Sequence, residues 1–277
     1  MSPRHRPWEE AADFQIGLRP IAPDDWLEGG EADPAARKDA LLAAHRGLVW
    51  AEKPDSRAGQ AEVLELVEAA LGPAPRPADL PPLPNLPPLY AAARRVADDL
   101  CLMEKHDDQW RLTALSLSAG SFFTAEEVIG RSLAELHGPV TGFADRFLVR
   151  VQRIFEGLRP ELVLERRNWT LLNSAELHTP SSAPIRARIG EIETAQAGAV
   201  LQLRVERQTL RRLPVTGGAL FTIRVWLASL SDLADQPERL AAFARAWRGA
   251  TPQLRAYKRF DLYDDLVEGF LARSLPA

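Results

Sequence analysis

The 277-residue sequence predicts an α+β fold built on a mostly antiparallel sheet. Helical patterns open and close the chain, and strand patterns occur in two groups between them. The two kinds do not alternate regularly, as they would around a parallel sheet. Two pairs of neighbouring strands are joined by short turns, which is typical of antiparallel pairing. We therefore expect one domain over residues 1–277.

Composition limits the class of protein. Hydrophobic residues make up 46% of the chain and charged residues 26%, as in soluble globular proteins. A net charge of −4 argues against general nucleic-acid binding, which needs a basic field. The single Cys101 excludes an intramolecular disulfide and an iron–sulfur cluster held by this chain. No signal peptide and no membrane span are expected, so a cytoplasmic location is the simplest prediction.

The N-terminal elements are helical. Residues 1–30 look irregular, and Asp33-Pro34 then predicts the start of a helix over 35–46 that Gly47 ends. A second helix is expected over 59–71, which completes an N-terminal helical segment, 1–72. Eight prolines between 73 and 88 then predict an extended connection, because neither a regular helix nor a central strand tolerates them.

The middle of the chain mixes both kinds of element. A helix is expected over 89–102. A hairpin should follow, with strands at 101–105 and 110–118 around Asp107-Asp108. Thr124 and Glu127 form a capping-box pattern, which predicts a helix that reaches His137 and ends at Gly138-Pro139. The remaining expected elements are a helix over 143–158, strands over 161–172, 185–193, 199–210 and 218–229, and helices over 237–271 with a break at 249–252.

Charges alternate with apolar residues in the strand 199–210. Alternation places Arg204 and Glu206 on one face, and it places Thr222 and Arg224 together on a face of the returning strand. A tight hairpin centred near Val215 would set Glu206 opposite Arg224. Such faces are ordinarily solvated, and the alternative is that they line a polar pocket.

Several catalytic motifs are absent from the sequence. We find no phosphate loop, no dinucleotide fingerprint, no paired-cysteine zinc motif and no Gly-x-Ser-x-Gly elbow. The five histidines are too scattered for a metal site at helical spacing. His137 stands at a predicted helix end, where an imidazole commonly caps the last carbonyls. The alternative is an axial ligand to haem iron.

Segments spread over nearly the whole chain together resemble one bacterial family. The chain is similar to the catalytic α subunit of haem-dependent oxidative N-demethylase. The segments are 17–20 with Trp26, 97–103, 129–130, 136–140, Arg167-Asn168-Trp169, 203–213, 217–224 and Tyr257-Lys258.

The resemblance implies a fold, a cofactor and a reaction. It implies a PAS-like antiparallel sheet with helices packed on one side, extra N- and C-terminal helices, and haem b with His137 as iron ligand. The implied reaction oxidises a small methylated amine with O2, giving the demethylated amine and formaldehyde. Electrons would come from a reductase subunit that carries FMN and a 2Fe–2S cluster.

Candidate roles follow for the polar residues. Glu206 is expected to bind the cationic amine, and Arg204 or Arg224 to polarise bound oxygen or hold Glu206 ionised. Arg150 and Arg153 are candidate partners for the haem propionates, although arginines on a helix are usually solvated. Trp169 and Phe221 are expected in the core or against the macrocycle. The acids Asp98 and Asp99 are expected to be solvated, and the alternative is that they cap or pair locally.

Two other functions remain open at this stage. The chain would be a non-catalytic haem-binding sensor if it binds haem without oxidising an amine. It would be an interaction subunit if it binds no haem.

Overall fold

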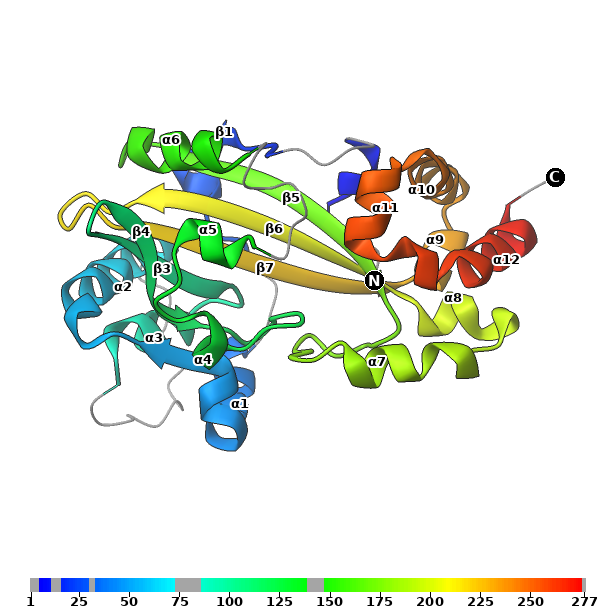
Figure 1. Ribbon diagram of the computed structural model, residues 1–277, viewed down its shortest axis with the longest axis horizontal. Coiled ribbons are helices and arrows are strands. Elements are labelled where there is room, and N and C mark those ends of the chain that lie inside the picture. The colour runs from blue at the N-terminus through cyan, green and yellow to red at the C-terminus, as the bar shows by residue number, and fades with distance from the viewer. Residues whose placement is uncertain (1–4, 11–15, 30–32, 73–85, 139–146, 276–277) are drawn as a thin grey trace. The chain divides into compact units, whose positions relative to one another are not determined.

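The computed structural model describes residues 5–10, 16–29, 33–72, 86–138 and 147–275. It confirms the predicted α+β class. Within these residues, seven strands form one antiparallel sheet in the order β1-β5-β6-β7-β3-β4-β2 (Figure 1). The strands are β1 (Arg19–Ile21), β2 (Trp50–Glu52), β3 (Asp99–His106), β4 (Gln109–Ser116), β5 (Val163–Leu172), β6 (Gln202–Arg212) and β7 (Ala219–Ser229).

The chain divides into two compact units. Unit 1 comprises Met1–Gly17, Arg167–Arg207 and Val225–Ala277, and unit 2 comprises Leu18–Arg166 and Gln208–Arg224. Three of the four unit boundaries fall inside β5, β6 and β7, and the fourth lies between Gly17 and Leu18. Residues 73–85 of the proline-rich connection lie outside the described residues.

Unit 2 contains the N-terminal helices and the first hairpin. Asp33 accepts a hydrogen bond from the Ala36 backbone N–H at 2.9 Å and caps α1, as predicted. The predicted end at Gly47 is wrong, because the helix continues to Val49 with a distortion at His45. The helices and 3-10 turns of unit 2 are η2 (Pro23–Asp25), α1 (Pro34–Val49), η3 (Pro54–Ser56), α2 (Arg57–Leu71), α3 (Pro88–Ala93), α4 (Ala125–Val128), α5 (Leu133–Leu136) and α6 (Val149–Gly157).

The hairpin of β3 and β4 forms where the sequence predicts it. His106 pairs with Gln109, so Asp107 and Asp108 are the two turn residues. Both have positive φ, 48° and 60°, which is the type I′ geometry that matches strand twist. The predicted helix over 89–102 is wrong beyond Ala93, because Asp99 onward joins this sheet.

The helix that the sequence predicts from Thr124 to His137 is divided into two short helices, α4 and α5. The capping box of Thr124 and Glu127 forms, but α4 ends at Val128. Gly130 follows with φ +81°, a conformation that interrupts the helix. A second capping box, between Ser132 and Glu135, starts α5. His137 therefore ends a one-turn helix.

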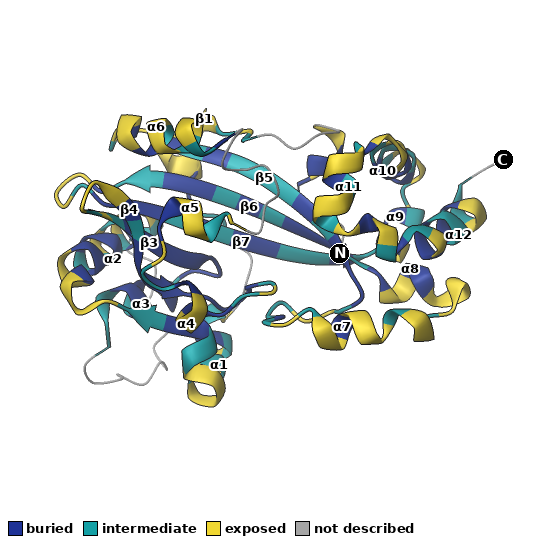
Figure 2. Cartoon of the chain, in the orientation of Figure 1, coloured by how far each residue is buried: buried dark blue, intermediate teal, exposed yellow. Residues whose placement is uncertain are grey.

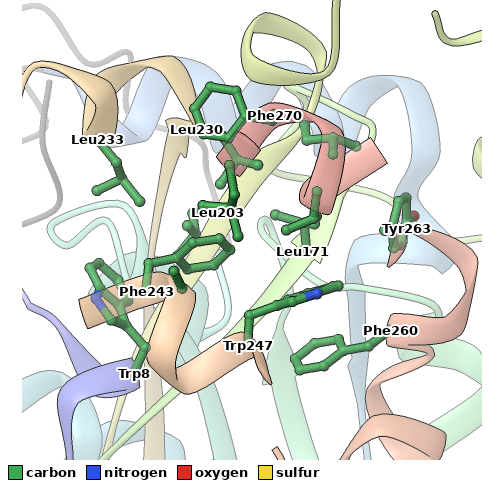
Figure 3. Packing of buried hydrophobic residues seen from close by; sticks show 14 of the residues in the cluster. Trp8, Leu171, Leu203, Leu230, Leu233, Phe243, Trp247, Phe260, Tyr263 and Phe270 are labelled. Atoms are coloured by element: carbon green, nitrogen blue, oxygen red, sulfur yellow. The ribbon is translucent and has the colours of Figure 1, made fainter. Parts of the chain in front are cut away.

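Unit 1 gathers its helices around the ends of β5 and β6. Figure 3 shows Phe243 and Trp247 of α10 packed beside Leu171 and Leu203 from the strands, and all four are buried. The helices and 3-10 turns of unit 1 are η1 (Pro7–Glu9), α7 (Ala183–Ala187), η5 (Ile189–Glu191), η6 (Thr194–Gln196), α8 (Ala197–Val200), α9 (Ser231–Ala234), α10 (Pro237–Gly249), α11 (Pro252–Lys258), η7 (Phe260–Leu262) and α12 (Asp264–Ser274).

The predicted strand over 185–193 is wrong. Its residues form α7 and η5, and Pro184 stands in the first turn of α7, where its missing N–H costs nothing. The predicted C-terminal helices and their break near Gly249 are confirmed. None of the described helices combines the length and apolar character needed to cross a membrane.

Candidate functional site

His137 caps the C-terminal end of α5 in unit 2. Its Nδ1 lies 2.8 Å from the carbonyl oxygen of Leu133, one helical turn earlier. A carbonyl can only accept a hydrogen bond, so Nδ1 carries the proton and Nε2 is the basic nitrogen of the neutral ring. The capping contact that the sequence predicts is therefore present, and it selects one tautomer.

The charge state of His137 follows from its surroundings. Burial lowers the pKa of His137 below its ordinary value, and the Arg166 guanidinium lowers it further. The hydrogen bond to Leu133 opposes this shift. A neutral imidazole with its Nδ1–H held by a carbonyl is the form that ligates metal ions. The neighbouring resemblance residues Pro139-Val140, and the start of the predicted helix 143–158, lie outside the described residues.

Arg204 and Glu206 form an ion pair on one face of β6 in unit 1. Arg204 Nε donates to Glu206 Oε1 at 3.0 Å, and Arg204 Nη1 donates to the Leu177 carbonyl at 3.1 Å. The side chain of Arg204 is 2% exposed and that of Glu206 is 16% exposed. The buried guanidinium thus favours the ionised form of the carboxylate beside it.

Two further residues of unit 1 join this pair. Asn168 Nδ2 donates to Glu206 Oε2 at 3.4 Å, and Asn168 Oδ1 accepts from Lys258 Nζ at 3.0 Å. Lys258 Nζ also donates to the Trp169 carbonyl and lies 4.9 Å from the centre of the Trp169 ring. We call Arg204, Glu206, Asn168 and Lys258 the β6 polar chain. It connects three segments that carry the family resemblance.

The turn end of the β6–β7 hairpin has a different register from the predicted one. In unit 2, the Thr209 and Thr222 hydroxyls lie 2.7 Å apart, and the Leu213 N–H donates to the Gly218 carbonyl. Both contacts belong to a register that is shifted by one residue from the register that would set Glu206 opposite Arg224. These contacts describe the turn end of the hairpin alone, so the pairing of Glu206 with Arg224 stays a prediction.

The other predicted site residues are placed individually. Arg150 and Arg153 are exposed on α6, whose outer face is largely yellow in Figure 2. Arg224 is buried in unit 2. Trp169 is buried in the aromatic core of unit 1, and Phe221 is half-buried against the core of unit 2.

Several buried polar residues escaped the sequence reasoning. Asp98 and Asp99 are both buried, so their predicted solvation is wrong. Asp99 accepts hydrogen bonds from the Ser118 N–H and hydroxyl and from the Ala119 N–H. Lys38 Nζ donates to the Asp98 carbonyl. Arg207 is as buried as Arg204, and an alternating strand pattern does not distinguish such a buried cation from a solvated one.

The described residues hold no group of three or more His, Cys, Asp or Glu side chains arranged for a metal ion. An iron porphyrin needs only one protein ligand, so this observation is compatible with His137 as that ligand. A surface pocket of about 560 Å³ lies in unit 1 between η1 and α10, over Trp8, Ala242 and Ala246. It contains none of the predicted site residues.

Comparison with known protein families gives a match over most of the chain. Residues 71–268 match the family described as haem-dependent oxidative N-demethylase, alpha subunit-like. The matched range covers well over half of the chain and contains every predicted site residue, from His137 to Arg224.

Proposed function

Because the chain belongs to the haem-dependent oxidative N-demethylase, alpha subunit-like family, we propose that it binds haem through His137 and demethylates a small methylated amine. In the proposed reaction, the N-methyl group and O2, with two electrons and two protons, give the demethylated amine, formaldehyde and water. The electrons would come from a separate reductase subunit, which we propose to carry FMN and a 2Fe–2S cluster. This chain has a single cysteine and supplies no thiolate set for that cluster.

The observation that carries the proposal is the state of His137. Its Nδ1–H is held by the Leu133 carbonyl, burial lowers the pKa of the ring and so favours its neutral form, and Nε2 is the nitrogen that would bind iron. This donor chemistry fits haem. When bound, the haem would supply the site where O2 is reduced and the methyl group oxidised.

The polar residues have proposed roles of their own. Glu206 would bind the substrate as an ammonium ion, since Arg204 favours its carboxylate form. Arg224, Arg150 and Arg153 remain candidates for anionic groups, the last two for the haem propionates. Trp169 and Phe221 remain candidates for contact with the macrocycle, although Trp169 is placed in the aromatic core of unit 1.

A reconstitution experiment tests this function. Purified protein loaded with haem should consume O2 and release formaldehyde when given dimethylamine and a chemical reductant. Trimethylamine without reductant is the blank. Haem uptake without formaldehyde for any methylated amine would identify a haem-binding sensor instead. Absence of haem uptake would reject both and leave an interaction subunit.

A further inference from the structure

The outer side of α6 carries two arginines that have no charged partner. Arg150 and Arg153 are neighbours on the helix surface, three residues apart, and both are exposed (Figure 2). Neither guanidinium forms a hydrogen bond or an ion pair within the described part of the chain. Val149, which precedes Arg150, is an apolar residue with 56% exposure. We call Val149, Arg150 and Arg153 the α6 outer face.

Positive charge around α6 is not balanced locally. Glu156 is the one acid among the residues of α6, and Lys105 Nζ lies 3.2 Å from its Oε1. Trp110 Nε1 donates to the same oxygen at 2.9 Å. Near the C-terminal end of the helix, the Arg212 guanidinium donates to the Phe155 carbonyl and adds another positive charge. A chain with a net charge of −4 thus concentrates cations around one helix.

The helix is fixed in place before any partner binds. Phe155 is buried, and its ring centre lies 5.3 Å from that of Trp110. The Arg212 guanidinium lies 5.1 Å from the centre of the Trp110 ring. With the hydrogen bonds of Glu156 and Arg212, these contacts hold α6 on the β3–β4 hairpin and on the end of β6. A surface that is already ordered loses little conformational entropy on binding.

The buried side of α6 belongs to the same apolar cluster as α5. Phe155 and the partly buried Ile154 pack in the cluster that contains Leu133 and Leu136 of α5. His137 follows Leu136 directly and caps the end of α5. A protein docked on the α6 outer face would therefore be separated by one helix from the cluster that supports the proposed iron ligand.

We infer that the α6 outer face docks an acidic surface of the protein that delivers electrons to this chain. This inference rests on the proposed function, which needs a separate subunit with a 2Fe–2S cluster. Arginines beside an exposed apolar residue suit a transient interface, because opposite charges accelerate the encounter and arginine is enriched at interfaces. Docking leads to a one-electron transfer that oxidises the cluster and reduces ferric haem iron to ferrous iron, with no bond made or broken.

The probe for the test is an acidic plant-type 2Fe–2S ferredoxin, and the chain is tested first without haem. Since Arg150 and Arg153 are also candidates for the haem propionates, omission of haem removes that role from the measurement. Arg153→Glu reverses one charge of the face. Val149→Glu adds an acid in the first turn of α6, where the helix dipole favours it, so this variant keeps the test open if Arg153→Glu does not fold.

The matched control changes the same charge elsewhere in unit 2. Arg46→Glu alters an exposed residue of α1, the helix that leads into β2 at the end of the strand order (Figure 1). Calorimetry measures ferredoxin affinity at several salt concentrations. In the haem-loaded chain, stopped-flow absorbance measures the rate constant of haem reduction by reduced ferredoxin, expressed relative to reduction of the same variant by dithionite.

The inference predicts that the face, and not net charge, decides binding. Arg153→Glu and Val149→Glu should each weaken ferredoxin binding about tenfold at low ionic strength, and Arg46→Glu by less than about twofold. The relative rate constants of haem reduction should follow the same order. Salt should reduce the differences, because it screens exposed charges.

Several results would overturn the inference. They are absence of ferredoxin binding by the wild type, wild-type affinity in both Arg153→Glu and Val149→Glu, and an equal loss in Arg46→Glu, which would mean that net charge alone is responsible. A wild-type dimer that Arg153→Glu converts to a monomer in sedimentation would assign the face to a second copy of the chain instead. Failure of the proposed function has a different signature, because the wild type would then take up no haem, whatever its affinity for ferredoxin.

Discussion

The Arg204 guanidinium and the Glu206 carboxylate lie two residues apart on one face of β6, with Arg204 Nε 3.0 Å from Glu206 Oε1. Their unequal burial, 2% against 16% exposure, makes the arginine the member that depends on its partner. A guanidinium removed from water is stabilised mainly by the charges and acceptors that replace that water. The pair therefore contributes both to the stability of unit 1 and to the proposed amine site.

The first prediction concerns the stability of this ion pair. Glu206→Ala removes the carboxylate and leaves the Arg204 charge buried, so the free energy of unfolding should fall by about 3–5 kcal/mol. Urea denaturation of the haem-free protein measures it. Glu268→Ala breaks the exposed pair of Arg248 and Glu268 and should cost less than about 1 kcal/mol. Equal effects of the two substitutions would contradict the role assigned to burial.

The second prediction concerns Asp99. Its carboxylate binds the Ser118 N–H, the Ser118 hydroxyl and the Ala119 N–H, and it is fully buried in unit 2. Asp99→Ala leaves two backbone donors without that acceptor, which should cost about 3–5 kcal/mol. Thermal and urea unfolding measure the loss, with the exposed Asp24→Ala as the control. A loss below about 1 kcal/mol would show that water replaces the carboxylate.

The third prediction concerns pH. Burial raises the pKa of Glu104 in β3 above its ordinary value, although the Thr113 hydroxyl, 2.5 Å away, stabilises the ionised form. Between the ordinary and the raised pKa the folded state binds more protons than the unfolded state. The contribution of Glu104 to stability is therefore complete below the ordinary pKa and is lost as pH rises through the raised one.

Substitution by a neutral isostere isolates this effect. Glu104→Gln should be more stable than the wild type at pH 7, and the difference should disappear as the pH approaches 4. Urea denaturation at both pH values measures it. Glu126→Gln, an exposed substitution on α4, should show no such dependence. A difference that stays constant from pH 4 to pH 7 would mean that the protonation of Glu104 is not coupled to folding.

Turn and capping signals in the sequence correctly predicted the hairpin and the helix start next to which they stand. Asp107 and Asp108 adopt the two left-handed conformations of a two-residue hairpin turn, and Thr124 caps its helix as the pattern indicates. The strand over 185–193 failed for a local reason as well. The spacing of its apolar residues fits both a strand and a helix. Pro184 is tolerated in the first turn of a helix and favours the helix that forms.

The contacts that connect distant segments could not be predicted in this way. Asn168 and Lys258 stand 90 residues apart and meet at 3.0 Å, and no spacing rule relates them. The register of the turn that joins β6 and β7 could not be predicted either, because a shift of one residue changes the face of every side chain. Asp98 and Asp99 are buried because other elements pack over them. The alternating pattern of β3 gives no indication of that packing.

The central claim is that His137 binds the haem iron, and the absorption spectrum of haem-reconstituted variants tests it most directly. The wild type and His106→Ala, which removes a partly exposed histidine of the β3–β4 hairpin, should take up one haem per chain with the same Soret band. His137→Ala should lose that band and its haem on gel filtration. A His137→Ala protein with the wild-type Soret band and full haem content would contradict the claim.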